Sequence, residues 1–494
     1  MLAYHWSSAL ELVRASGGSD DEIVQRTRLA LRAAGDRASS LNSYAVASAQ
    51  YDDALALWPD DAERPDLLFR LAVALHRSYN ATRQQGALEA ARDALLAVGD
   101  TERASEAESF LSRFFWERGE HDLVREHLGR AEALAGDSVS AAAARVLAFA
   151  GRIREIAGDH DEGRRLAEAA FATATELGLD ELRAHALTTI GMAKNDVDLG
   201  SGLADMERAL EIALAADSPV ASAIVNNLAV YSTFAGDFRR TDELYAEATR
   251  LGERYGDAAS VRFVRGNRIF LDFFLGRWDR ALESADTFIA ECEAGSPHTL
   301  EYMAREIRSA LWLARGDQDA ALRDQLQSFE HAQTRHERFH RLGSLAITAA
   351  LYAELGQVDE AHALAVQVPP LVREVGLHGA LTRLGLFADE LGIGDELRDA
   401  VAAGAGPRLP FWQSVIEHVL AGELAAADIM ASGGNVTSEA NLRKYAGIRM
   451  LAAGEAAAAE VELERALAFY RSVDASAYVA QIESALAGAQ SESA

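Results

Sequence analysis

The sequence predicts an all-α fold in which antiparallel helix pairs stack, with a period of about 40 residues, into a right-handed superhelical solenoid. Three observations carry this prediction. A glycine after an apolar helical run recurs at a constant spacing, the apolar residues of each run share one helix face, and no run of alternating β-branched residues indicates a strand. The chain has 494 residues but only 8 prolines, so long uninterrupted helices are possible.

The recurring glycine marks the predicted turn inside each helix pair. Its successive steps are 39, 78, 40, 40 and 40 residues, and the second step is twice 39. The glycines are Gly119, Gly158, Gly236, Gly276, Gly316 and Gly356. Glycine adopts the left-handed conformation after a helix C-terminus without steric cost, so we expect that conformation at each turn. We expect Asp159, Asp237 and Asp317, which follow three of these glycines, to cap the second helices.

A small side chain stands five residues past the turn in several pairs, where it allows two helices to approach closely; these residues are Ala281, Ala321, Ala361 and Ala459. The predicted pairs span 36–58, 64–97, 101–135, 138–177, 180–216, 220–255, 258–294, 299–335, 337–367 and, turning at Gly454, 437–472. A capping helix is predicted over 478–486. The chain thus divides into helical repeats (1–367), an irregular helical connection (368–410), and further repeats with the capping helix (411–494).

Composition excludes several classes of function. The net charge of −28 argues against direct binding of nucleic acid and against an anionic membrane surface, because both require a basic face. The lone Cys292 excludes an internal disulfide framework. The sequence contains neither an apolar run long enough for a membrane span nor a secretory signal at its start, so we expect a cytoplasmic protein.

The pairs resemble tetratricopeptide repeats in a long, 40-residue form. The pair over 220–255 carries this best, with Val225-Asn226-Asn227-Leu228-Ala229 followed by Gly236-Asp237-Phe238. In that family the first helix of each pair lines a concave surface, and an asparagine on it hydrogen-bonds the backbone of a bound peptide. The resemblance implies this role for Asn227 and Asn267, which share one repeat position, and for the adjacent Asn226. Bridging of neighbouring helices is the alternative role.

A second resemblance covers nearly the whole chain, through the segments Ser40–Leu57, Gly202–Ala213, Gly276–Gly295 and Phe469–Tyr478. It is similar to the C-terminal repeat region of actinobacterial signalling proteins that fuse an adenylate or guanylate cyclase domain to an AAA ATPase. The resemblance implies a sensor or docking arm that regulates such a module in cis or in trans. The chain has no G-x-x-x-x-G-K-[ST] phosphate loop, so it carries no ATPase site of that kind.

Two sets of charged residues are further candidates for binding. Arg265, Arg268 and Asp272 recur at helical spacing on a face that such repeats usually bury. The set indicates a pocket for a small anion or a peptide carboxylate, a salt bridge between repeats, or a helix rotated so that these residues are hydrated. Arg113, Arg145 and Arg152 are placed on the inner face, where they form a positive spot or pair with the nearby Glu106 or Glu155. Phenylalanine and tryptophan stripes near 110–116 and 263–278 are interpreted as core.

One motif suggests catalysis. His336-Glu337-Arg338-Phe339-His340 matches H-E-x-x-H, in which two histidines hold zinc and the glutamate acts as a base, as in a zinc hydrolase. Such a site needs a third ligand, and Glu354 lies fourteen residues on along the same helix. Two surface histidines are the simpler interpretation. The sequence therefore favours a non-catalytic scaffold without cofactor or metal, which binds a protein or peptide.

Overall fold

A computed structural model describes residues 1–18, 20–80, 82–136, 138–195, 198–333, 338–403 and 409–492. Every regular element in these residues is a helix and none is a strand, which confirms the all-α prediction. The helices are α1 (Leu2–Ala15), α2 (Asp21–Ser40), α3 (Tyr44–Leu57), α4 (Arg64–Arg77), α5 (Gln84–Ala97), α6 (Thr101–Arg118), α7 (His121–Ala135), α8 (Ala141–Ile156), α9 (His160–Glu176), α10 (Asp180–Asn195), α11 (Leu199–Ala215), α12 (Val220–Phe234), α13 (Phe238–Tyr255), α14 (Ala258–Phe274), α15 (Trp278–Glu293), α16 (Glu301–Arg315), α17 (Gln318–Gln333), α18 (Arg338–Glu354), α19 (Val358–Ala365), α20 (Val368–Val375), α21 (Leu381–Leu384), α22 (Gly394–Ala403), α23 (Pro410–Leu420), α24 (Ala425–Gly433), α25 (Val436–Ala452), α26 (Ala456–Ser472) and α27 (Ser476–Glu492).

The glycine turns have the predicted backbone conformation. The φ angle lies between 75° and 97° at the six glycines from Gly119 to Gly356, and it is 81° at Gly454. The alanines five residues past four of the turns have no exposed surface, which confirms that helices meet closely there. The predicted caps form at Asp237, which accepts from the Arg240 N–H, and at Asp317, but not at Asp159, whose side chain accepts no capping bond.

The N-terminal end differs from the prediction. The first predicted pair, 36–58, is instead formed by the longer α2 and by α3, with α1 packed before them. Their turn uses Asn42 at φ 56° rather than a glycine, so a search for glycine turns does not find it. At the other end, α27 extends beyond both ends of the predicted capping helix.

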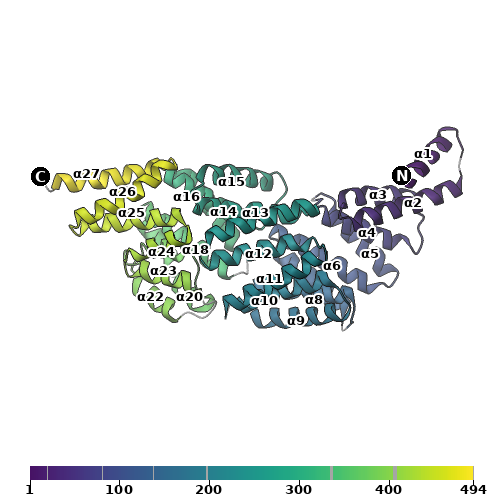
Figure 1. Cartoon of the computed structure of the whole chain (residues 1–494), viewed down its shortest axis with the longest axis horizontal. Helices are drawn as coiled ribbons and strands as arrows, with labels where there is room; N and C mark the ends of the chain where they lie inside the picture. The colour runs from purple at the N-terminus through teal and green to yellow at the C-terminus, as the bar shows by residue number, and fades with distance from the viewer. Residues whose placement is uncertain are drawn as a thin grey trace.

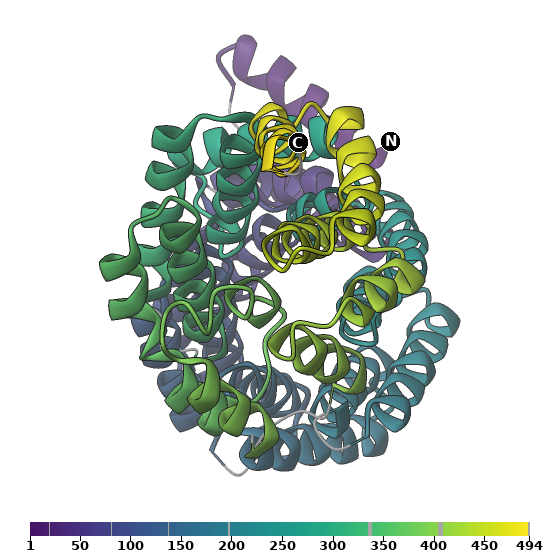
Figure 2. The ribbon, with the colours of Figure 1, turned by 90° about the vertical axis from the view of Figure 1, so that its left-hand side faces the viewer.

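The helix pairs wind into an elongated right-handed superhelix with the two chain termini at opposite ends (Figure 1). Viewed along the long axis, the helices surround that axis (Figure 2). Successive superhelical turns touch through hydrogen bonds between residues that lie 159 to 183 positions apart, or about four repeats. Examples are Arg262 Nη1 to the Tyr79 hydroxyl at 2.7 Å and Trp412 Nε1 to the Thr233 carbonyl at 3.3 Å.

Three of the glycine turns receive the C-terminal helices. A side chain at Gly236 would overlap the ring of Phe411 in α23, and one at Gly276 would lie 3.0 Å from Val436 in α25 and from Phe469 in α26. Gly316 faces Ala477 in α27. The C-terminal helices thus pack against successive glycine turns of the preceding superhelical turn. They form continuous apolar cores with the helices of that superhelical turn.

Between Val368 and Ala403 the helices α20, α21 and α22 are short, whereas α25 and α26 form a full pair. The division into parts at 367 and 410 stays a prediction. Within the described residues, no helix is both long enough and apolar enough to cross a lipid bilayer.

Gly236→Ala and Gly454→Ala separate the two roles of a turn glycine. Both have φ 81°, so both variants incur the strain of a left-handed alanine, but only Gly236 faces a neighbour, whereas nothing lies within 4 Å of a side chain at Gly454. We expect Gly236→Ala to lower the free energy of unfolding by about 1–3 kcal/mol more than Gly454→Ala. Urea denaturation followed by circular dichroism measures this difference. Equal losses would contradict the docking role of the turn.

Candidate binding site in the central cavity

The superhelix surrounds a partly open cavity of about 1280 Å³, called the central cavity below. The first helices of successive pairs provide most of its wall, from α4 through α18, as the repeat pattern predicts. Residues of α23, α25 and α27 complete the wall at the far end, because the C-terminal helices seat on the preceding turn. The enclosure therefore depends on both halves of the chain.

The repeat register decides which side chains face this cavity. Lining residues recur 6, 9 and 13 positions before the turn glycine, which places them on one face of each first helix. At position −9 these are Phe110, Phe149, Asn227, Asn267, Ile307 and Ile347; at −6, Arg113, Arg152, Val230, Phe270 and Ala310; at −13, Arg145, Ala223, Phe263, Met303 and Gly343. The wall consequently changes from basic in α6 and α8 to amide-bearing in α12 and α14, and then to apolar.

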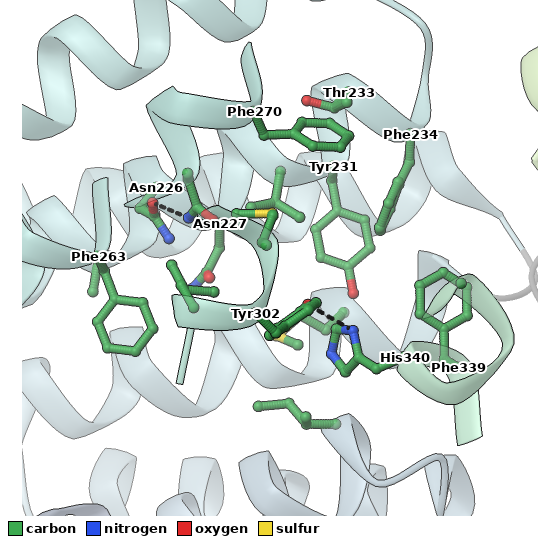
Figure 3. Close-up of a pocket in the computed structure, with 18 of the residues that line it drawn as sticks. Asn226, Asn227, Tyr231, Thr233, Phe234, Phe263, Phe270, Tyr302, Phe339 and His340 are labelled. Carbon is green, nitrogen blue, oxygen red and sulfur yellow. Dashed lines mark hydrogen bonds between the residues drawn. The ribbon is translucent and has the colours of Figure 1, made fainter. Parts of the chain in front are cut away.

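The three predicted asparagines, Asn226, Asn227 and Asn267, all line the cavity and form what we call the amide row. Figure 3 labels the first two. Asn267 donates from Nδ2 to Asn226 Oδ1 at 3.0 Å, so this pair links α14 to α12. Asn227 Oδ1 accepts from Arg152 Nη2 at 3.0 Å, which fixes that amide against α8. The structure thus joins Asn226, Asn227, Asn267 and Arg152 in one constellation.

Arg145 also lines the cavity, but it is neutralised. Its Nε lies 2.6 Å from Glu106 and its Nη1 lies 4.0 Å from Glu181. Arg77 pairs with the same Glu181 at 2.7 Å and holds the pKa of that carboxyl at about 2. Glutamates thus neutralise most of the arginines at the basic end of the cavity.

Arg265 and Arg268 do not line the central cavity. They stand 11 and 8 residues before Gly276, outside the lining register, and they point toward the neighbouring second helices. Arg265 pairs with Glu291 of α15, and Arg268 pairs with Asp242 of α13 at 3.1 Å. The buried Asp272 pairs with Arg277 and Arg280. These contacts correspond to the salt-bridge alternative rather than to an anion pocket.

The H-E-x-x-H motif lies only partly within the described residues, because His336 and Glu337 fall outside them. His340 lies on the cavity wall, with Nδ1 at 2.9 Å from the Tyr302 hydroxyl. Glu354 pairs with Arg383 at 2.6 Å and with Lys444 at 3.3 Å, so other residues already engage the third candidate ligand. No group of three potential metal ligands occurs in the described part of the chain. The zinc site stays a prediction.

Aromatic residues supply the apolar part of the wall, and some of them belong to the stripes near 110–116 and 263–278 that the sequence predicts to be core. Tyr231 and Phe234 of α12 meet at 5.4 Å between ring centroids, and Phe234 lies 6.4 Å from Phe339 of α18. We call these three residues the aromatic cluster; Figure 3 shows it beside the amide row. Phe263 and Phe270 also line the cavity, whereas Phe114 and Phe115 are buried as predicted. The repeat register could have identified Phe270 at position −6 and Phe263 at position −13, whereas Tyr231, Phe234 and Phe339 lie outside the three lining positions.

The charge of the wall contrasts with that of the whole chain. The described lining residues include six arginines and five carboxylates, whereas the chain carries −28. Burial, reinforced by Arg152 and Arg113, lowers the pKa of His185 to about 3. The cavity is therefore a nearly neutral, partly apolar interior within an acidic molecule.

A buried ion cluster adjoins the cavity wall through Arg383 and Tyr478, which line the cavity. Lys444 of α25 has no exposed surface, and its Nζ lies 3.3 Å from Glu354 and 3.5 Å from the ring centroid of Tyr478. Burial lowers the pKa of Lys444 to about 8 although Glu354 opposes the shift. Although burial acts to raise it, Lys444 and Arg383 hold the pKa of Glu354 at about 2.

No family model and no curated protein matches this sequence. Among solved structures, the chain is similar to a Rap protein complexed with competence and sporulation factor, with a TM-score of 0.52 and 14% identity over 70% of this chain and 98% of that chain. The apo quorum sensor NprR from B. thuringiensis has a TM-score of 0.42 and 13% identity, over 69% and 98% of the two chains. A STAND signal-transduction ATPase with a tetratricopeptide repeat sensor, from Pyrococcus horikoshii, has 0.40 and 13%, over 72% and 54%. This chain thus spans about half of that ATPase.

The likeness to the Rap protein, together with the helix pairs and their turns, shows a tetratricopeptide-like helical-repeat fold.

Lys444 should make stability depend on pH. Its pKa is about 8 in the folded chain against an ordinary 10.5, so the unfolded chain binds the extra proton between these values. The free energy of unfolding therefore gains a contribution as pH rises from 8 toward 10.5, and loses it as pH falls through 8. Urea titrations at pH 7.5, 8.5 and 9.5 should show wild type gaining stability relative to Lys444→Met. Parallel pH profiles of the two proteins would contradict this assignment.

Proposed function

We propose that this chain is a non-catalytic scaffold that binds a peptide, or an extended segment of a protein partner, inside the central cavity. The amide row carries the proposal. Asn227 Nδ2, Asn226 Nδ2 and Asn267 Oδ1 make no hydrogen bonds within the described residues, although all three side chains line the cavity. An extended backbone offers alternating N–H and C=O groups, which such amides can bind.

The size and lining of the cavity support a peptide over a small metabolite. At about 1280 Å³ it exceeds the range of about 300–1,000 Å³ that is typical of small-molecule pockets. The amide row supplies polar contacts that are independent of ligand sequence, while the aromatic cluster supplies apolar contacts that depend on it. The solved structure of the similarly folded Rap protein holds a bound factor, which also supports a binding function.

A finer part of the proposal is that this binding regulates an ATPase or nucleotide cyclase, in cis or in trans. The similarity of the segments Ser40–Leu57 and Gly276–Gly295 to the repeat arms of cyclase–ATPase fusions supports it. The test is to search the open reading frame and the neighbouring genes for an ATPase or cyclase module. The rate of ATP hydrolysis or cyclic nucleotide formation by that module is then measured with and without this chain. An unchanged rate would contradict regulation and leave peptide binding intact.

Peptide binding is testable by selection from a displayed library of random nonapeptides on the full chain, followed by fluorescence anisotropy with the enriched peptides. Asn227→Ala should weaken binding by about three- to tenfold, because it removes backbone hydrogen bonds. Gln85→Ala is the matched control: it also removes a side-chain amide, but from an exposed position of α5 outside the cavity. Failure to enrich any peptide, or equal affinities of the two variants, would contradict the proposal.

A further inference from the structure

We propose that the ligand of the central cavity carries a carboxylate bound by Arg152, about three residues away from a large apolar side chain packed on the aromatic cluster. This inference rests on the proposed function, because it specifies the chemistry of the peptide that the same cavity binds. The carboxylate belongs either to an acidic side chain or to the C-terminus of the peptide, and the experiment below separates these sources.

Arg152 differs from the other arginines of the cavity wall. Five of the six pair with a carboxylate, as Arg113 does with Glu117 at 3.1 Å and Arg383 with Glu354 at 2.6 Å. The remaining pairs are Arg77–Glu181, Arg145–Glu106 and Arg338–Glu374. Arg152 has no carboxylate within ion-pair distance among the described residues. The nearby Glu155 is engaged by His160 at 3.0 Å.

The contacts of Arg152 leave it suited to an anion. Its guanidinium donates to Asn227 Oδ1 at 3.0 Å, and its Nη1 lies 2.8 Å from the Met192 sulfur. A neutral amide and a thioether compensate a desolvated cation weakly, whereas a carboxylate forms charge-assisted, bidentate hydrogen bonds with a guanidinium. Burial lowers the pKa of Arg152 and Arg113 adds to this shift, while Tyr231 and Glu155 oppose it in part. A ligand carboxylate would therefore relieve a desolvation cost that the unliganded wall offsets only in part.

The spacing follows from α12. Asn227, which Arg152 contacts, and Phe234 of the aromatic cluster are seven residues apart and lie on the same wall. At 1.5 Å per residue the separation along the helix is about 10 Å. An extended peptide advances about 3.3–3.6 Å per residue, so about three residues bridge the distance. Tyr231 lies between the two points and provides an apolar surface for the intervening segment (Figure 3).

The test repeats the nonapeptide selection on three full-length proteins: wild type, Arg152→Gln and Arg265→Gln. Arg265 is the matched control, because its replacement removes the same charge but affects a residue that pairs with Glu291 outside the cavity. We expect the wild-type and Arg265→Gln pools to enrich Asp, Glu or a C-terminal carboxylate about three positions from Phe, Tyr, Trp or Leu. The Arg152→Gln pool should keep the apolar preference and lose the acidic one.

Changes in the peptide test the same contact with unmodified protein, so the result does not depend on the folding of a variant. For the best peptide, Asp→Asn or Glu→Gln, or amidation of its C-terminus, should weaken binding to wild type by about tenfold, and the modification that does so identifies the source of the carboxylate. The same modification should change binding to Arg152→Gln by less than about twofold.

The outcomes distinguish this inference from the proposed function. Pools without an acidic preference, or with one that survives in Arg152→Gln, would overturn the carboxylate site while leaving peptide binding established. Absence of enrichment in all three proteins would overturn both. A preference at the expected spacing that only Arg152→Gln loses would support both.

Discussion

The packing of the C-terminal helices onto the left-handed glycine turns is the contact on which the rest of the structure depends. A single helix pair cannot bury its apolar surface alone, so repeats usually stack only on their sequence neighbours. Here α23 to α27 also seat on the turns at Gly236, Gly276 and Gly316, about four repeats back along the chain. This second set of contacts converts an open concave face into the wall of a deep, partly open cavity.

Enclosure changes the energetics of the groups on that wall. An arginine on an open concave face is hydrated, and its charge contributes little to affinity. Inside the central cavity the same group loses water, as the lowered pKa of Arg152 and that of His185 indicate. Polar contacts with a ligand consequently become stronger and more selective. The repeat register therefore places basic, amide and apolar side chains in succession along the cavity wall, where each type affects the binding of a ligand.

Periodic and local features of this fold could be predicted from the sequence, whereas contacts between superhelical turns could not. The glycine turns and the small residues such as Ala281 follow from the geometry of one pair, and a constant spacing reveals them. Asn42 replaces a glycine and hides its turn. No local sequence pattern indicates that Trp412 contacts Thr233, because the two residues belong to different superhelical turns. Nor does a local pattern show that Phe234 and Phe339 face a cavity rather than a core. The helical spacing of Arg265 does not show whether its side chain faces the cavity. Its position relative to the turn glycine is needed to predict that it does not.

The contrast between an acidic exterior and a nearly neutral cavity bears on selectivity. Surface charges act over about 8 Å at physiological ionic strength, so the net charge of −28 disfavours the approach of a strongly acidic ligand. One carboxylate at Arg152 is favourable, whereas a further carboxylate would meet the amide row or the aromatic cluster, where no unpaired cation compensates it among the described residues. Specificity is a difference between the affinities for two ligands. Here the rejection of a second negative charge contributes to that difference as much as the attraction of the first negative charge by Arg152. Under the proposed function, this arrangement would select a peptide that carries a single negative charge at a defined distance from its large apolar side chain.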